Sequence, residues 1–124
     1  TPLYSSAASD VYKRQATGLA LADVTIKPIT VEAALMLARV PIVPFFYPGT
    51  NELGEAVGEH IMGNRILLLQ NHGVVGVGYD LIEAVSAVEL LEECAMMMWV
   101  ASHFGEPSVL PAHDIELIKK LYKI

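Results

Sequence analysis

Charged residues are scarce in this chain, and basic residues are the scarcest of them. Only 18% of its 124 residues are charged, and 8 lysine and arginine residues stand against 14 aspartate and glutamate residues, which gives a net charge of −6. A protein that binds nucleic acid normally presents a basic patch. The sequence has no such cluster, so we exclude nucleic acid as a partner.

Long apolar runs are missing as well. A membrane-spanning helix needs about 18 or more mostly apolar residues in a row. Charged residues interrupt every candidate run: Glu32, Glu52, Arg65, Glu83 and Glu89. The N-terminus also lacks the basic and then apolar regions of a secretory signal. We therefore expect neither a membrane segment nor secretion.

Cysteine is nearly absent. Cys94 is the single cysteine, and it cannot form a disulfide within the chain. Its surroundings are apolar and helical in pattern, which predicts a reduced thiol in the core. A reduced thiol suits a cytoplasmic protein.

Apolar residues, by contrast, are abundant. They make up 53% of the chain, which is more than a small monomer can comfortably cover with polar surface. With a membrane excluded, this composition favours a globular piece that buries surface against other subunits.

The first fifteen residues differ in origin from the remainder of the chain. Residues 5–15 read SSAASDVYKRQ, which is the translation of the transposase adapter used to prepare sequencing libraries. The alternative is a natural Ser/Ala-rich linker followed by a short basic helix. We interpret residues 1–15 as non-native and exclude them from fold reasoning, with the origin of residues 1–4 left open. The native sequence is then expected to begin near Ala16.

The remaining residues alternate between helical and extended patterns, with no visible domain boundary. Caps, prolines and apolar periodicity indicate the following elements: helix 16–22, extended 24–29, helix 30–38, a buried strand 41–47 at an edge or an end, a helix that begins at 48–50 and ends at 63–64, strands 66–70 and 74–77, helix 80–103, and a helix from 111. This order predicts an α/β domain.

One short stretch holds the best candidate for chemistry. Residues 67–78 read LLLQNHGVVGVG and place His72 between two apolar strands. A neutral imidazole is the commonest protein metal ligand. The alternative is a turn histidine that is hydrogen-bonded to nearby backbone. Gly73 tolerates a positive φ, which favours a tight reversal between the strands. The flanking glycines let backbone or a ligand approach closely.

Three motifs carry a resemblance to a known family. PGTNEL at 48–53, LLLQNHGVVGVG at 67–78 and EAVSAVELLEECA at 83–95 resemble the class II aldolase/adducin family in order and spacing, over nearly all of residues 16–124. The resemblance implies a three-layer α/β/α sandwich with a mixed, mostly antiparallel sheet. It also implies a homotetramer with active sites at the subunit boundaries.

The resemblance further implies a metal site that this chain cannot complete. The family holds a catalytic Zn²⁺ with three histidines, and His72 matches one of them. The other two form an H-x-H motif that would fall just before Ala16, where adapter-like residues stand. No histidine precedes His60, and the family's acidic and phosphate-binding residues lie further upstream. We therefore expect a domain truncated at its N-terminus, with its catalytic and substrate-binding residues unknown.

Several functions are compatible with that resemblance. The first is a zinc-dependent aldolase that cleaves a ketose 1-phosphate to dihydroxyacetone phosphate and an aldehyde, inactive in this fragment. The alternatives are a sugar-phosphate 4-epimerase or a phospho-keto-acid decarboxylase on the same scaffold, or a non-enzymatic, adducin-like interaction module. The presence of His72 favours an enzyme, because an interaction module would tolerate its loss.

Other polar and aromatic residues have simpler interpretations. His60 is expected to be satisfied within a helix, His103 to cap the long helix, and His113 to lie on the surface. The acidic side chains at 89, 92 and 93 are expected to form a solvated face, and residues 96–99 a core or subunit interface. Tyr47 could line the cleft.

Overall fold

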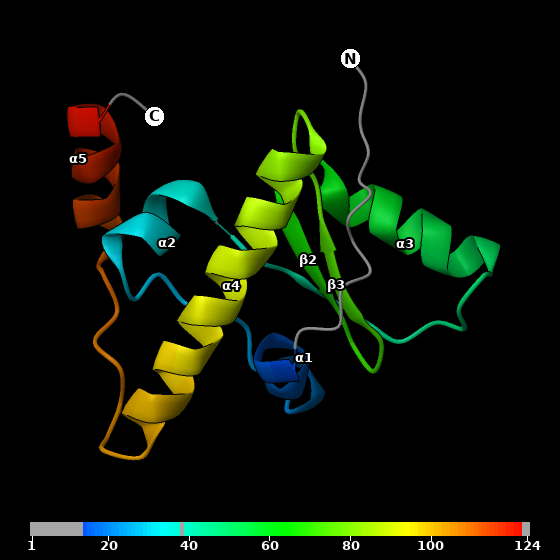
Figure 1. Ribbon diagram of the computed structural model, residues 1–124, viewed down its shortest axis with the longest axis horizontal. Helices are drawn as coiled ribbons and strands as arrows, with labels where there is room; N and C mark the ends of the chain where they lie inside the picture. Colours follow the sequence, from blue (N-terminus) through cyan, green and yellow to red (C-terminus); the bar gives the residue numbers. More distant parts are fainter. Residues whose placement is uncertain (1–13, 38, 123–124) are drawn as a thin grey trace.

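The computed structural model describes residues 14–37 and 39–122. Residues 1–13 of the segment that we interpret as non-native lie outside this description. The described elements are, in chain order, α1 Arg14–Leu21, α2 Val31–Met36, β1 Ile42–Val43, α3 Asn51–Ile61, β2 Ile66–Leu69, β3 Gly73–Gly76, α4 Leu81–Ser102 and α5 Ala112–Tyr122 (Figure 1). The predicted α/β alternation is therefore confirmed.

The described strands form one mixed sheet in the order β1-β2-β3. β1 pairs with β2 in parallel, with Ile42 opposite Leu68, and β2 pairs with β3 in antiparallel, with Leu68 opposite Val74. The parallel pair follows from the α3 crossover, and the antiparallel pair from a short hairpin. The described sheet thus has one pair of each kind, so it is mixed as predicted but not mostly antiparallel.

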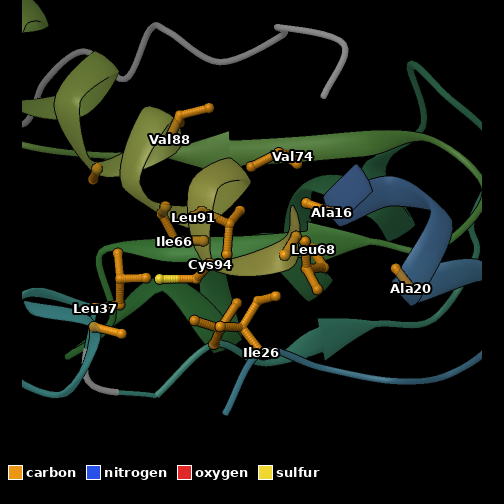
Figure 2. Packing of buried hydrophobic residues seen from close by; sticks show 14 of the residues in the cluster. Ala16, Ala20, Ile26, Leu37, Ile66, Leu68, Val74, Val88, Leu91 and Cys94 are labelled. Atoms are coloured by element: carbon orange, nitrogen blue, oxygen red, sulfur yellow. The ribbon is translucent and has the colours of Figure 1, made fainter. Parts of the chain in front are cut away.

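β2 is the centre of the fold and is buried on both faces. Ile66 and Leu68 pack in one core with residues of α1 and α4, as Figure 2 shows. Leu67 and Leu69 point to the opposite face and pack with Ala56 of α3. Because strand side chains alternate between faces, four consecutive leucines and isoleucines supply both cores. Helices therefore cover both faces of the described sheet.

The edge strand is much shorter than predicted. Pairing covers only Ile42–Val43, although the sequence predicted a strand over 41–47. Pro44 has no N–H to donate, which ends the ladder, and Phe45 and Tyr47 are exposed. β1 is an edge strand of the described sheet, in agreement with the predicted position at an edge or an end.

Side-chain caps begin three of the helices, and the sequence predicted the caps of two of them, at Thr30 and Asp80. The side chains of Thr30, Thr50 and Asp80 accept hydrogen bonds from the backbone N–H three residues later, as N-cap residues do. The second helix is shorter than its predicted range of 30–38, because it ends at Met36 with Leu37 as its C-cap. Ala38 lies outside the described residues.

α4 buries one side against the sheet and leaves large apolar side chains exposed on the other. Leu91, Cys94 and Met98 are buried, whereas Ile82 is 78% and Trp99 54% exposed. The predicted burial of this helix against another subunit stays a prediction. None of the described helices is long and apolar enough to cross a membrane.

Candidate functional site

The candidate site is the turn between β2 and β3. Residues 70–72 link the two strands, and the backbone N–H of His72 donates to the Leu69 carbonyl at 3.0 Å. The positive φ of the turn belongs to Asn71, at +64°, and Gly73 is the first residue of β3. The predicted tight reversal is therefore present, with its positive φ at Asn71 rather than at Gly73. Asparagine enters the left-handed region more readily than most residues, which explains its place here.

The turn is fastened to the end of α1. The Gln70 Nε2 donates to the carbonyl of Ala20 at 3.3 Å, and Figure 1 shows the turn and α1 at the same end of the sheet. The His72 side chain is exposed at this end. The turn is thus held at Gln70 and at His72, while His72 is accessible to a ligand. That the ring faces the start of α1 stays a prediction.

The glycines after the turn serve the packing of α4. A Cβ on Gly76 would lie 2.6 Å from Val88 Cγ2, and a Cβ on Gly78 would lie 2.8 Å from the backbone nitrogen of Ala84. The close approach that the sequence predicted is therefore made by the backbone and side chains of α4. A Cβ on Gly73, next to His72, would meet no atom of the described residues within 4 Å.

A carboxylate from α4 holds the start of α1. The two oxygens of Glu92 accept hydrogen bonds from the backbone N–H groups of Gln15 and Ala16, each at 3.0 Å. The sequence placed Glu92 on a solvated face with Glu89 and Glu93. Those two are exposed, but Glu92 is half-buried, so the prediction was wrong for Glu92. The one signal in the sequence was its position beside Leu91, off the polar stripe of the helix.

The other three histidines have local partners. His60 is half-buried, and its Nδ1 lies 2.7 Å from the Ala56 carbonyl oxygen within the same helix. His103 is the C-cap of α4, with its Nδ1 2.8 Å from the Trp99 carbonyl oxygen. His113 has an 82% exposed side chain next to Asp114. All three match their predicted structural roles.

Tyr47 lies beside a hollow next to the start of α3. It lines a hollow of about 380 Å³ together with Phe45, Phe46, Thr50 and Glu52. Its ring meets that of Phe45 edge to face, with 5.7 Å between the centroids. Tyr47 therefore borders a hollow at the start of α3, and its place in a catalytic cleft stays a prediction.

The described residues do not make a metal site by themselves. No three or more His, Cys, Asp or Glu side chains gather to hold a metal ion within residues 14–37 and 39–122. A catalytic zinc normally has about three protein ligands and one open position. His72 fits the chemistry of one such ligand but supplies no more than one.

Comparison with a family model gives a match over most of the chain. The model described as "Class II Aldolase and Adducin N-terminal domain" matches residues 11–99. The match begins inside the segment that we interpret as non-native, and the boundary at Ala16 stays a prediction.

Individual proteins are similar over parts of their length. The 3-oxo-tetronate 4-phosphate decarboxylase of Escherichia coli (strain K12) is 35% identical over 75 residues, which are 60% of this chain and 35% of that protein. An L-fuculose phosphate aldolase of Methanococcus maripaludis is 33% identical over 87 residues, which are 70% of this chain and 47% of that protein.

A solved structure shares the fold. An L-fuculose 1-phosphate aldolase superposes with a TM-score of 0.81 at 31% sequence identity, over 92% of this chain and 54% of that one. The chain thus spans about half the length of this structure, and no more than half of the two relatives.

Proposed function

Because the chain belongs to the class II aldolase and adducin family, we propose that it is the C-terminal part of a metal-dependent aldolase. The reaction would cleave a ketose 1-phosphate to dihydroxyacetone phosphate and an aldehyde. The observation that carries the proposal is the likeness to two L-fuculose phosphate aldolases in both sequence and fold. Both are proteins of about twice the length that this chain covers.

In this proposal, His72 is one of the three histidines that hold the Zn²⁺ of the complete enzyme. The other two histidines and the acidic group that moves the proton come from residues upstream of Ala16. When bound, the metal would stabilise the negative charge that develops on the substrate oxygens. This chain would hold the turn that carries His72, through the hydrogen bond from the His72 N–H to the Leu69 carbonyl and the one from the Gln70 side chain to Ala20.

The chain by itself is then inactive. One exposed imidazole binds a metal ion only weakly in water, and a catalytic site normally needs about three protein ligands. We also propose that residues 1–15 stand in place of the upstream residues. The complete protein would be a cytoplasmic homotetramer, with the exposed apolar side chains of α4 covered by a neighbouring subunit.

A second candidate is the decarboxylation of a phosphorylated keto acid. The support is the 35% identity with a 3-oxo-tetronate 4-phosphate decarboxylase, which is as high as the identity with the two L-fuculose phosphate aldolases. Both reactions place negative charge on a carbon next to a carbonyl group, so one scaffold can serve either.

The test uses an extended protein, in which the residues encoded by the native reading frame upstream of Ala16 replace residues 1–15. Release of dihydroxyacetone phosphate from L-fuculose 1-phosphate is measured beside release of carbon dioxide from 3-oxo-tetronate 4-phosphate. We expect the first product from the extended protein and neither from the 124-residue chain. Carbon dioxide alone would favour the decarboxylase, and an upstream frame without an H-x-H motif would overturn both candidates.

A further inference from the structure

We infer that Glu92 is a positioning residue: a cap supplied by α4 that fixes where the chain enters α1. The inference starts from two hydrogen bonds that join residues 76 and 77 positions apart in the sequence. The Glu92 Oε2 accepts from the Gln15 N–H and the Glu92 Oε1 from the Ala16 N–H, each at 3.0 Å. Both oxygens of one carboxylate are thus used on consecutive amides.

α1 needs a cap that its own first turn does not provide. The first N–H groups of a helix have no partner within the helix, and the positive end of the helix dipole favours a negative charge there. The first turn of α1 contains no acidic residue and begins with Arg14. Glu92 therefore supplies the charge and the acceptors that a local side chain usually supplies.

The cap is held on a rigid support. Leu91 and Cys94, on either side of Glu92 in α4, are fully buried, and Ala16 is fully buried in the same core. Figure 2 shows Ala16 facing the cluster that contains Leu91 and Cys94. With both ends packed, the carboxylate has little freedom, so the direction of the chain before Ala16 is fixed relative to α4.

The contact does not depend on which side chains precede Ala16. Both donors are backbone N–H groups, so any residue at position 15 other than proline keeps them. The positioning would therefore act equally on native upstream residues. This last step rests on the proposed function, in which the residues that complete the active site enter at this point.

The test begins with the 124-residue chain, so that it does not depend on catalysis. Amide hydrogen exchange and amide proton shifts of Gln15 and Ala16 are compared in wild type, Glu92→Gln and Glu92→Ala. Glutamine keeps one acceptor oxygen and loses the charge, whereas alanine loses both. We expect exchange at these amides to rise in that order, by about fivefold or more for Glu92→Ala, with an upfield shift of both protons.

Two comparisons separate positioning from general loss of stability. Glu93→Gln changes the exposed neighbouring carboxylate and should leave the Gln15 and Ala16 amides unchanged. Exchange at Leu67 and Leu68 in β2 should change little in the Glu92 variants. Unchanged α1 amides in Glu92→Ala, or an equal rise in α1 and β2, would overturn the inference.

The same variants in the extended protein test the link to function. Glu92→Gln should lower kcat more than it changes KM. The catalytic groups of the enzyme would still be present, but they would be misaligned with the bound substrate. A wild-type extended protein without turnover would refute the proposed function and leave the amide result standing. Wild-type turnover together with an unaffected Glu92→Ala enzyme would refute the positioning role.

Discussion

Gly76 and Val88 lie so close that no side chain fits between them. A Cβ at position 76 would stand 2.6 Å from Val88 Cγ2 and 3.1 Å from the Ala84 carbonyl oxygen. This contact sets the distance between β3 and α4, and β3 leads directly from the His72 turn. Gly76 and Gly78 of the GVVGVG stretch therefore allow the close packing of α4 that supports the candidate site.

Alanine at either close glycine should destabilise the fold. We expect Gly76→Ala and Gly78→Ala to lower the free energy of unfolding by about 1–3 kcal/mol, because the new methyl group forces α4 away from the sheet. The control is Gly58→Ala in α3, where a Cβ would meet no described atom within 4 Å. Alanine there should raise stability by about 0.5–1 kcal/mol. Urea unfolding of the three variants measures the effect, and equal stability of all three would contradict it.

The cap of α4 gives a second prediction. The Asp80 Oδ1 accepts from the Glu83 N–H at 2.8 Å, which satisfies one unpaired donor of the first turn. Asp80→Ala should cost about 1 kcal/mol, whereas Asp80→Asn should cost much less because asparagine is also a good N-cap. Thermal unfolding of both variants shows whether Asp80 stabilises the helix through its hydrogen bond as a cap or only through its negative charge. A loss of the same size in both would contradict the capping role.

The buried thiol predicts a pH dependence of stability. Burial raises the pKa of Cys94 above the ordinary thiol value, and a smaller effect of a hydrogen bond with Thr30 lowers it. The unfolded thiol therefore ionises at lower pH than the folded one. Its contribution to stability is full below the unfolded pKa and is lost as the pH rises toward the folded pKa.

Comparison with Cys94→Ala isolates this contribution from other groups that titrate in the same range. The difference in free energy of unfolding between wild type and Cys94→Ala should be constant near pH 7 and should shrink above about pH 8.5. A difference that is constant up to pH 10 would show that the thiol is not shielded from ionisation.

Much of the fold could be predicted because its signals are local. Thr30, Thr50 and Asp80 each mark the start of a helix, because their side chains accept a hydrogen bond from the backbone N–H three residues later. The four consecutive apolar residues of Ile66–Leu69 are typical of a strand that is buried on both faces, as it is here. These elements depend on neighbours in sequence, which a pattern can capture.

The misses lie where the pairing of segments, rather than a residue pattern, decides the structure. The exposed Phe45 and Tyr47 looked like strand residues, but the ladder ends where Pro44 lacks its N–H. Glu92 looked like a surface carboxylate because its two partners lie at the other end of the chain. At the turn, Gly73 and Asn71 could both take a positive φ, and the register of the hairpin decided for Asn71.

The central claim is that His72 is one ligand of a metal site that the remainder of the protein completes. The direct measurement is Zn²⁺ binding, by titration and by metal content, for the 124-residue chain, the chain with its native upstream frame, and the extended His72→Ala variant. His113→Ala, which changes another exposed histidine, serves as the matched control.

We predict no stoichiometric Zn²⁺ in the 124-residue chain and one Zn²⁺ per chain in the extended protein. His72→Ala should weaken that binding by more than about 100-fold, since it removes a ligand rather than an outer partner, and His113→Ala should not change it. An extended protein that binds Zn²⁺ equally well without His72, or a 124-residue chain that binds one Zn²⁺ tightly, would contradict the account.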